Sequence, residues 1–231
     1  MRWDDASAIS DRSPPGVTAS EVVFRRLLHA IISGELAPEC LETEERLAAR
    51  YEVSRTPLRD AIRRLEQLRL LQREPRGLRI PPLSLEEMLD LSLTREVLEG
   101  LLAASSARRI AKGVANAARL RQIHIRHLQV QALGDAELTL SVGLDFHEEL
   151  RRLAANHSAA ACHEQVMLGF ERYRHLASRV PQRPGLIGEE HSEILDAIEA
   201  GDAPAAEAAM RRHIAAGRDL YARVLSGMLA P

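Results

Sequence analysis

Three arginines at helical spacing are the first side chains in this chain whose type and spacing could do chemistry. Arg55, Arg59 and Arg63 fall at i, i+4 and i+8, so they would share one face of a helix. A guanidinium can donate two parallel hydrogen bonds to O6 and N7 of guanine, and it also pairs with phosphate. Arg55 and Arg59 are therefore the candidates for base contacts, and Arg63 is placed toward solvent or the DNA backbone.

The segment around these arginines is basic although the whole chain, with a formal net charge of −2, is not. Between Arg50 and Ile80 there are nine arginines and four acidic residues. A confined basic patch on a nearly neutral protein is typical of a surface that binds a polyanion. Charge alone leaves an alternative open, namely a solvated helix face with ion pairs at i, i+4.

Three histidines form a second candidate group. His147, His191 and His213 each continue the apolar stripe of a different predicted helix, so all three should point into a helical bundle. One inward histidine is usually a hydrogen-bonded core residue. Three that converge are different, because imidazole is a common ligand for Zn, Ni and other borderline metals.

Other polar residues carry weaker signals. His124 and His127 are spaced i, i+3, but no further ligand converges on them in the sequence, so we expect both to be exposed. Arg95 lies among leucines and needs a partner if it is buried. Glu99, four residues further on, could supply a salt bridge. The remaining histidines have no predicted role: His29, His157, His163 and His175.

The arginines must be positioned by three short helices. The first is predicted over 20–33, and Gly34 ends it as a helix C-cap glycine would. Thr43 caps a second helix that runs to Arg50, and residues 51–53 make a tight turn. Ser54 caps the third helix, whose first turn contains Pro57 at a position where the missing N–H costs nothing. This pattern predicts a helix-turn-helix.

A change of period after the third helix predicts a two-stranded wing. Residues 70–74 and 78–81 read as strands on either side of a turn at 75–77. The wing would place Arg76 and Arg79 next to phosphates. Gly77 would allow the backbone to approach DNA closely.

The histidines must be positioned by a helical bundle. After the break at Pro81 and Pro82, Ser84 and Glu87 form a capping box. Short loops imply antiparallel neighbours. The predicted fold class is therefore mainly α: a winged helix-turn-helix followed by an all-helical antiparallel bundle of six or seven helices. The helices are expected at about 85–111, 115–133, 136–155, 158–179, 184–200 and 203–228, with one break at Pro181 to Gly185.

The predicted organisation is a disordered leader over 1–16, the DNA-binding domain over 17–82 and the helical domain over 83–231. No stretch approaches the roughly 20 apolar residues that cross a bilayer. The leader contains acids and no apolar core, so it is not expected to be a signal peptide. Cys40 and Cys162 lie in different predicted domains, which favours a reducing, cytoplasmic compartment over a disulfide framework.

The run from Glu45 to Ile62 (ERLAARYEVSRTPLRDAI) resembles the signature of the GntR family of regulators. The segment ISGEL at 32–36 resembles an upstream part of the same family. The resemblance implies operator-DNA contacts by Arg55, Thr56 and Arg59, and it makes Gly77 the wing glycine. The predicted DNA site also includes Ser54, the cap of the third helix, and Arg76, which the wing would place next to a phosphate. The implied protein is a cytoplasmic, homodimeric, DNA-binding transcription regulator, expected to be a repressor and not an enzyme.

The second half resembles the FCD effector domain of the FadR-like branch, most specifically in the phrases at 190–202 and 210–213. That resemblance implies a divalent metal, Zn or Ni, on His147, His191 and His213, with an Asp one turn before the first histidine. Gly143 occupies that position here. Two alternatives follow: a three-histidine site with open positions for water or an effector carboxylate, or a metal-free pocket. Arg95 would lie near the pocket, where it could hold the carboxylate of a small organic acid.

Two other classes of protein remain as alternatives. A metal-dependent hydrolase built on the three histidines would need a general acid or base, and no Asp or Glu lies beside them on an inward stripe at a usable spacing. A helical scaffold protein would not need the pattern from Ser54 to Arg59 followed by a wing.

Overall fold

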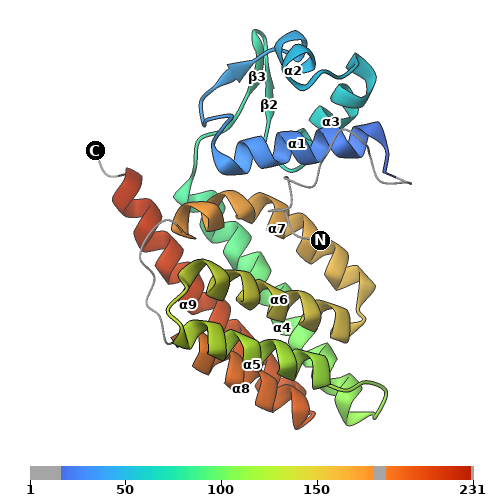
Figure 1. Ribbon diagram of the computed structural model, residues 1–231, viewed down its shortest axis with the longest axis vertical. Coiled ribbons are helices and arrows are strands. Elements are labelled where there is room, and N and C mark those ends of the chain that lie inside the picture. The colour runs from blue at the N-terminus through green and yellow to red at the C-terminus, as the bar shows by residue number, and fades with distance from the viewer. Residues whose placement is uncertain (1–16, 179–185, 230–231) are drawn as a thin grey trace. The chain divides into compact units, whose positions relative to one another are not determined.

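The computed structural model describes residues 17–178 and 186–229, and the chain divides into two compact units after Ser84. Within the described residues there are nine helices and a three-stranded sheet (Figure 1). The predicted fold class, mainly α with a winged helix-turn-helix and a helical bundle, is confirmed. The expected leader over 1–16 and the expected break at Pro181 to Gly185 lie outside the described residues.

The first unit is built on α1 (Ala19–Ser33), α2 (Glu44–Tyr51) and α3 (Arg55–Gln67). Thr18 and Thr43 begin the first two helices, because each hydroxyl accepts a backbone N–H three residues further on. Both α1 and α2 pack against α3. The core between them consists of fully buried apolar side chains, among them Phe24, Leu27, Leu28, Leu47, Leu58, Ile62 and Leu65.

The wing contains one strand more than the sequence predicted. Strands β2 (Gln72–Glu74) and β3 (Gly77–Arg79) form the expected antiparallel hairpin, and β1 (Leu41–Glu42) pairs with the other edge of β3. In the register, Leu78 of β3 lies opposite both Glu42 and Arg73. A strand of two residues has no measurable period, so only the tertiary pairing reveals β1.

The second unit contains the remaining helices. Their bounds are α4 (Leu85–Ala111), α5 (Ala118–Ala132), α6 (Ala136–Ala154), α7 (His157–Ser178), α8 (Leu186–Glu199) and α9 (Ala203–Leu229). Helix α4 is central, since it packs against α6, α7, α8 and α9, and Figure 1 shows α9 running alongside it. Helix α5 starts three residues later than predicted, where the side chain of Asn116 accepts the N–H of Ala118.

One apolar core extends through this bundle, with Phe146, Leu150, Ile194, Ile198, Met210 and Ile214 among its buried residues. Several buried polar side chains lie in the same interior, including histidines from α5 and α8 and glutamates from α4 and α6. Buried polar groups need partners, and the contacts that satisfy them define the second candidate site below. No helix in the described residues is both long and apolar enough to span a membrane.

Candidate nucleic-acid interface and metal centre

The face of α3 that does not enter the core is a row of exposed polar side chains. Arg55, Thr56, Arg59 and Arg63 are all exposed, whereas Leu58 of the same helix is completely buried. The 3.6-residue period of the helix produces this division, because the leucine anchors the helix and thereby fixes the direction of the arginines. The predicted common face for the three arginines is present.

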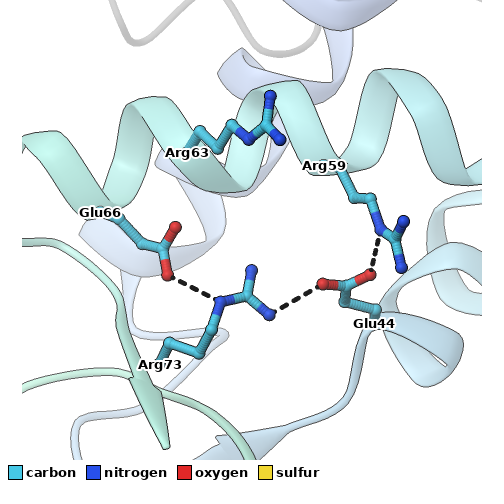
Figure 2. Close-up of a pocket in the computed structure, with 5 residues that line it drawn as sticks. All are labelled: Glu44, Arg59, Arg63, Glu66 and Arg73. Atoms are coloured by element: carbon cyan, nitrogen blue, oxygen red, sulfur yellow. Dashed lines mark hydrogen bonds and ion pairs between the residues drawn. The ribbon is translucent and has the colours of Figure 1, made fainter.

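Arg59 is held in place by Glu44 at the start of α2. The Nε of Arg59 lies 2.8 Å from Oε2 of Glu44, and the other carboxylate oxygen accepts from Nη1 of Arg73 at 3.0 Å (Figure 2). Arg73 also reaches Glu66 of α3, at 3.2 Å. The hydrogen bond from Arg59 is the main reason why the pKa of Glu44 is lowered, so this carboxylate stays ionised. Because only Nε of Arg59 is used, its two terminal nitrogens are left to meet an outside acceptor.

The neighbouring arginines differ in how they are engaged. Arg55 lies 3.9 Å from Glu45, a loose exposed pair that costs little to break. Arg63 lines the hollow drawn in Figure 2, where no interaction joins it to the other four residues. Arg64 has a structural role instead, because it pairs with Glu21 of α1 at 2.6 Å and lies over the ring of Phe24.

Ser54 stands at the N-cap position of α3 but does not cap it with its side chain. Its backbone is extended, as at an N-cap, and no side-chain hydrogen bond to the helix forms. That part of the prediction is wrong, since the hydroxyl is exposed and left for another partner. No acidic residue lies in the first turn of α3. The unpaired N–H groups and the positive end of the helix dipole suit a phosphate.

Gly77 is required by the wing itself. Its φ is +146°, and a Cβ added there would lie 2.3 Å from the carbonyl oxygen of Glu42 in β1. From the sequence we expected Gly77 to let the backbone approach DNA. In the structure the close approach at Gly77 is instead to the backbone of the neighbouring strand β1. Arg76, at the turn between β2 and β3, is exposed. Arg79 is paired with Glu39 and Glu74, so it is less available than Arg76.

The second site is a cluster of histidines in the interior of the bundle. His147 of α6, His191 of α8 and His213 of α9 meet through their Nε2 atoms, which is the convergence expected from their inward stripes. Nε2 of His213 lies 3.2 Å from Nε2 of His147 and 3.3 Å from Nε2 of His191. Both distances are close to the edge of a tetrahedron around an ion of the size of Zn²⁺, and the three ligand atoms all lie within 4.8 Å of one another.

Carboxylates hold the outer nitrogens of two of these rings. Nδ1 of His147 contacts Glu99 of α4, and Nδ1 of His213 lies 2.7 Å from Glu190. A carboxylate on Nδ1 keeps the proton there and leaves the Nε2 lone pair facing inward, which is the usual arrangement around metal-ligating histidines. The expectation that no acid lies beside the histidines is therefore wrong. Glu99 lies on a different helix from His147, and no local sequence pattern predicts how those two helices pack. Glu190 is next to His191 in the sequence, but its carboxylate contacts Nδ1 of His213.

Arg95 forms a salt bridge to Glu99, which is one of the two alternatives predicted for it. It is buried, and its Nε lies 2.6 Å from Oε1 of Glu99. The same oxygen contacts Nε2 of His163, at 3.2 Å. Burial opposes ionisation of Glu99, but Arg95 and the two histidines outweigh it and hold the pKa of this carboxyl well below its usual value. Arg95 thus keeps the partner of His147 charged.

His124 and His127 are not exposed, contrary to the prediction. His127 is completely buried and its Nδ1 lies 3.1 Å from Nδ1 of His191, while His124 contacts the hydroxyl of Ser192 at 2.8 Å. A signal was available in the sequence: Leu120, His124, His127 and Val130 form one continuous stripe at i, i+4, i+7 and i+10, and this is the buried face of α5.

Three of the clustered histidines, His147, His127 and His191, are neutral near pH 7. Burial is the largest cause in each case: it lowers the pKa of His147 to about 4 and that of His127 to about 4, and it moves the pKa of His191 well below the usual value. Neutral imidazole is the form that ligates a metal. Two groups of three ligand atoms lie within 4.8 Å of one another in the described residues, and both contain His191: one with His147 and His213, the other with His124 and His127.

Comparisons with known proteins match both units separately. Residues 19–77 match the model of the gntR family of bacterial regulatory proteins, and residues 90–216 match the FCD domain. The FCD match alone spans more than half of the chain. The chain belongs to the GntR family of regulators with an FCD domain.

Two relatives extend this family assignment over most of the chain. The chain is 30% identical to an HTH-type transcriptional regulator of the unstable DNA locus of Streptomyces ambofaciens, over 90% of this chain and 87% of the relative. It is 31% identical to a probable D-xylose utilization operon transcriptional repressor of Paenarthrobacter nicotinovorans, over 86% of this chain and 87% of the relative. These relatives are regulators, so this GntR protein is a transcription regulator and not an enzyme.

Solved structures share the fold. E. coli McbR/YncC superimposes with a TM-score of 0.70 at 20% identity, over 90% of this chain and 98% of that one. A GntR-type regulator from Rhodococcus gives a TM-score of 0.67 at 21% identity, over 91% and 99%. These two structures therefore show the fold of this chain, whereas it is the family membership that sets aside the hydrolase and scaffold classes.

Proposed function

We propose that this GntR regulator is a homodimeric repressor whose affinity for its operator is controlled by a small organic acid bound in the FCD domain. The observation that carries the DNA-binding part is the exposed arginine face of α3, in which Glu44 holds Arg59 by Nε alone. Relatives whose names describe them as repressors support the direction of control, among them the Paenarthrobacter protein and E. coli RspR, which is 26% identical.

On DNA, α3 would lie in the major groove. Arg55 and Arg59 would contact base edges, since a guanidinium can bind guanine O6 and N7 together. Ser54, Thr56 and the first N–H groups of α3 would bind a phosphate, and Arg76 would follow the backbone from the turn of the wing, which Gly77 shapes. Glu44 acts as a positioning residue, because it restricts Arg59 before DNA arrives. Because these contacts are made to DNA, we place the protein in the cytoplasm.

Two copies of the chain are needed to contact two half-sites of an operator. Helix α4 offers a surface for such pairing. Leu93, Val97 and Leu101 fall at i, i+4 and i+8 and are 49%, 50% and 38% exposed. Three large apolar side chains one turn apart on the solvent side of a helix would lower the free energy of the protein if a second copy covered them.

In the FCD domain, His147, His191 and His213 would hold a divalent ion, Zn or Ni, through Nε2. The fit is supported by the two carboxylates on the outer nitrogens and by the neutral state of the buried rings. Such an ion would supply positive charge to the carboxylate of an effector. Arg95 would act through Glu99, which it keeps ionised, rather than by holding the effector directly. The effector changes DNA affinity only insofar as it binds one conformation of the dimer better than another.

The test starts with selection of binding sites from a random duplex library by the wild-type protein, followed by affinity measurements on the selected sequence. Arg59→Ala should weaken specific binding by about 1–3 kcal/mol, roughly 5- to 150-fold, if Arg59 contacts a base. Arg126→Ala removes the same charge from an exposed position on α5 and should leave the affinity unchanged. Failure to enrich any sequence, or equal affinities for wild type and Arg59→Ala, would contradict the proposed mode of binding.

A further inference from the structure

Each of the three inward histidines has a partner on its outer nitrogen, and the third partner is another histidine. Nδ1 of His147 contacts Glu99, and Nδ1 of His213 contacts Glu190. Nδ1 of His191 lies 3.1 Å from Nδ1 of His127. His127 therefore contacts the outer nitrogen of His191, just as Glu99 and Glu190 contact the outer nitrogens of His147 and His213.

This contact fixes the proton positions on both rings once Nε2 of His191 ligates an ion. A neutral imidazole carries one proton, so His191 must then carry it on Nδ1 and donate it to Nδ1 of His127. Nδ1 of His127 is the acceptor, and its own proton must lie on Nε2. That Nε2 atom is buried and has no hydrogen-bond partner among the described residues. A buried donor without an acceptor is costly, so it marks a place where an acceptor belongs.

The position of this free N–H is defined by Gly143. A Cβ built on Gly143 would lie 3.6 Å from Nε2 of His127 and 3.9 Å from Cε1 of His191. Gly143 is on the same helix as His147 and one turn before it, so a side chain at this position would point toward the cluster. Both distances are ordinary van der Waals contacts, so the glycine leaves room for at least a Cβ beside Nε2 of His127.

We propose that His127 is a functional part of this centre: it orients His191, and its Nε2–H donates to an oxygen of a small carboxylate that enters beside Gly143. This inference rests on the proposed metal site of His147, His191 and His213. The three imidazoles are neutral ligands, and Glu99 and Glu190 contact only outer nitrogens, so no protein carboxylate would contact the ion itself. An anion from outside the chain would supply that direct negative charge. The ligand class is a monocarboxylate as small as formate or acetate.

The other group of three, His124, His127 and His191, is the competing arrangement, in which His127 would itself be a ligand. In that group Nε2 of His124 contacts the hydroxyl of Ser192, at 2.8 Å, so Nδ1 of His124 would have to be the ligand atom. The group with His147 and His213 is favoured because carboxylates hold the outer nitrogens of two of its rings: Glu99 contacts His147, and Glu190 contacts His213.

The experiment uses the full-length chain loaded with Co²⁺, whose visible spectrum reports on its coordination. Co²⁺ affinity is measured by competition with a chelator, and acetate is then titrated into the loaded protein. The variants are His127→Ala, His127→Gln, Gly143→Asp and His147→Ala, with His124→Gln as the matched control, a neighbouring buried histidine on the same helix face. Circular dichroism and thermal melting of the metal-free variants establish that each one folds.

We expect His127→Ala to bind Co²⁺ about 10- to 100-fold more weakly, as loss of an outer partner usually does, and to lose most of its response to acetate. His127→Gln should recover part of both, because its amide can accept from His191 and also donate. Gly143→Asp should bind Co²⁺ more tightly and no longer respond to acetate, because its own carboxylate takes the open place. His124→Gln should behave as wild type.

Three results would overturn the inference in distinguishable ways. Wild-type affinity and acetate response in His127→Ala would remove His127 from the centre but leave the metal site standing. Equal loss of Co²⁺ in His124→Gln and His127→Ala, with retention in His147→Ala, would place the ion in the other group of three. No Co²⁺ binding by the wild type would refute this inference together with the metal part of the proposed function, while operator binding would be unaffected.

Discussion

Two glycines, Gly77 and Gly143, act through the side chain they lack. At Gly77 the absent Cβ allows the carbonyl of Glu42 to approach β3. At Gly143 it leaves space against the ring of His127, where Cβ itself would make only an ordinary contact. At Gly77 any side chain would collide with backbone atoms. At Gly143 a Cβ would fit, and the effect of a substitution would depend on which groups the longer side chain contacts. They should therefore respond very differently to substitution.

Gly77→Ala should destabilise the winged domain, by about 1–3 kcal/mol. The added Cβ would lie 2.3 Å from a backbone oxygen, so the β1–β3 pair would have to separate. Gly34→Ala is the control, because Gly34 also has a positive φ, +79°, but nothing lies within 4 Å of its Cβ position. Urea unfolding followed together with DNA affinity makes the comparison. If the two variants lose equal stability, the contact with Glu42 is not what requires glycine at 77.

At the scale of the element, α4 carries two unusual sets of side chains on opposite faces. Its inner face contributes buried Arg95 and Glu99, which support the histidine centre. Its outer face carries the apolar stripe of Leu93, Val97 and Leu101. A helix of 27 residues that is polar inside and apolar outside over the same turns departs from the usual pattern of a surface helix. Both departures are explained if the inner face supports a bound ion and the outer face meets a second copy.

Val97→Glu should shift the protein from dimer to monomer, because the dimer would have to bury two unpaired carboxylates, one on each copy. Ile125→Glu, at a site 48% exposed on α5, introduces the same charge away from the stripe and should leave the dimer intact. Sedimentation at micromolar concentration distinguishes the two states. A monomeric wild type, or a Val97→Glu protein that remains dimeric, would rule out this face as the dimer interface.

At the scale of the whole molecule, the second unit concentrates titratable groups in its interior. The pKa of His147 and that of His127 are each lowered to about 4, mainly by burial, from the usual value of 6.5. The unfolded chain therefore takes up protons at a higher pH than the folded one. Folding free energy is pH-dependent wherever the two states bind different numbers of protons, so these histidines make the fold sensitive to mild acid.

The metal-free protein should lose stability as the pH falls from about 6.5 towards 4. Above that range these histidines should contribute almost no pH dependence to the free energy of unfolding. In this window the unfolded state gains protons that the folded state still excludes. Thermal melting at pH 8, 6.5 and 5 measures the loss, and His127→Gln should reduce it. His29→Gln, which changes an exposed histidine of the first unit, should not. A melting temperature that stays constant between pH 6.5 and 5 would contradict the neutral, buried state of His147 and His127.

The sequence by itself determined the elements and the direction of many side chains. Caps, turn residues and the position of Leu58 place Arg55, Arg59 and Arg63 on one exposed face, and the apolar periods turn His147, His191 and His213 inward. These features depend on residues within one or two helical turns, so local patterns suffice to predict them. The same reasoning, applied to Leu120 and Val130, would have placed His124 and His127 on a buried face.

Only the tertiary structure decided which inward groups meet. Glu99 reaches His147 from a helix 48 residues earlier in the chain, and His127 reaches His191 across 64 residues. The two-residue strand β1, and with it the need for glycine at Gly77, likewise exists only through pairing with β3. A helical period specifies the face that is buried, but the neighbour on that face is set by how whole helices pack, and that depends on all of their contacts together.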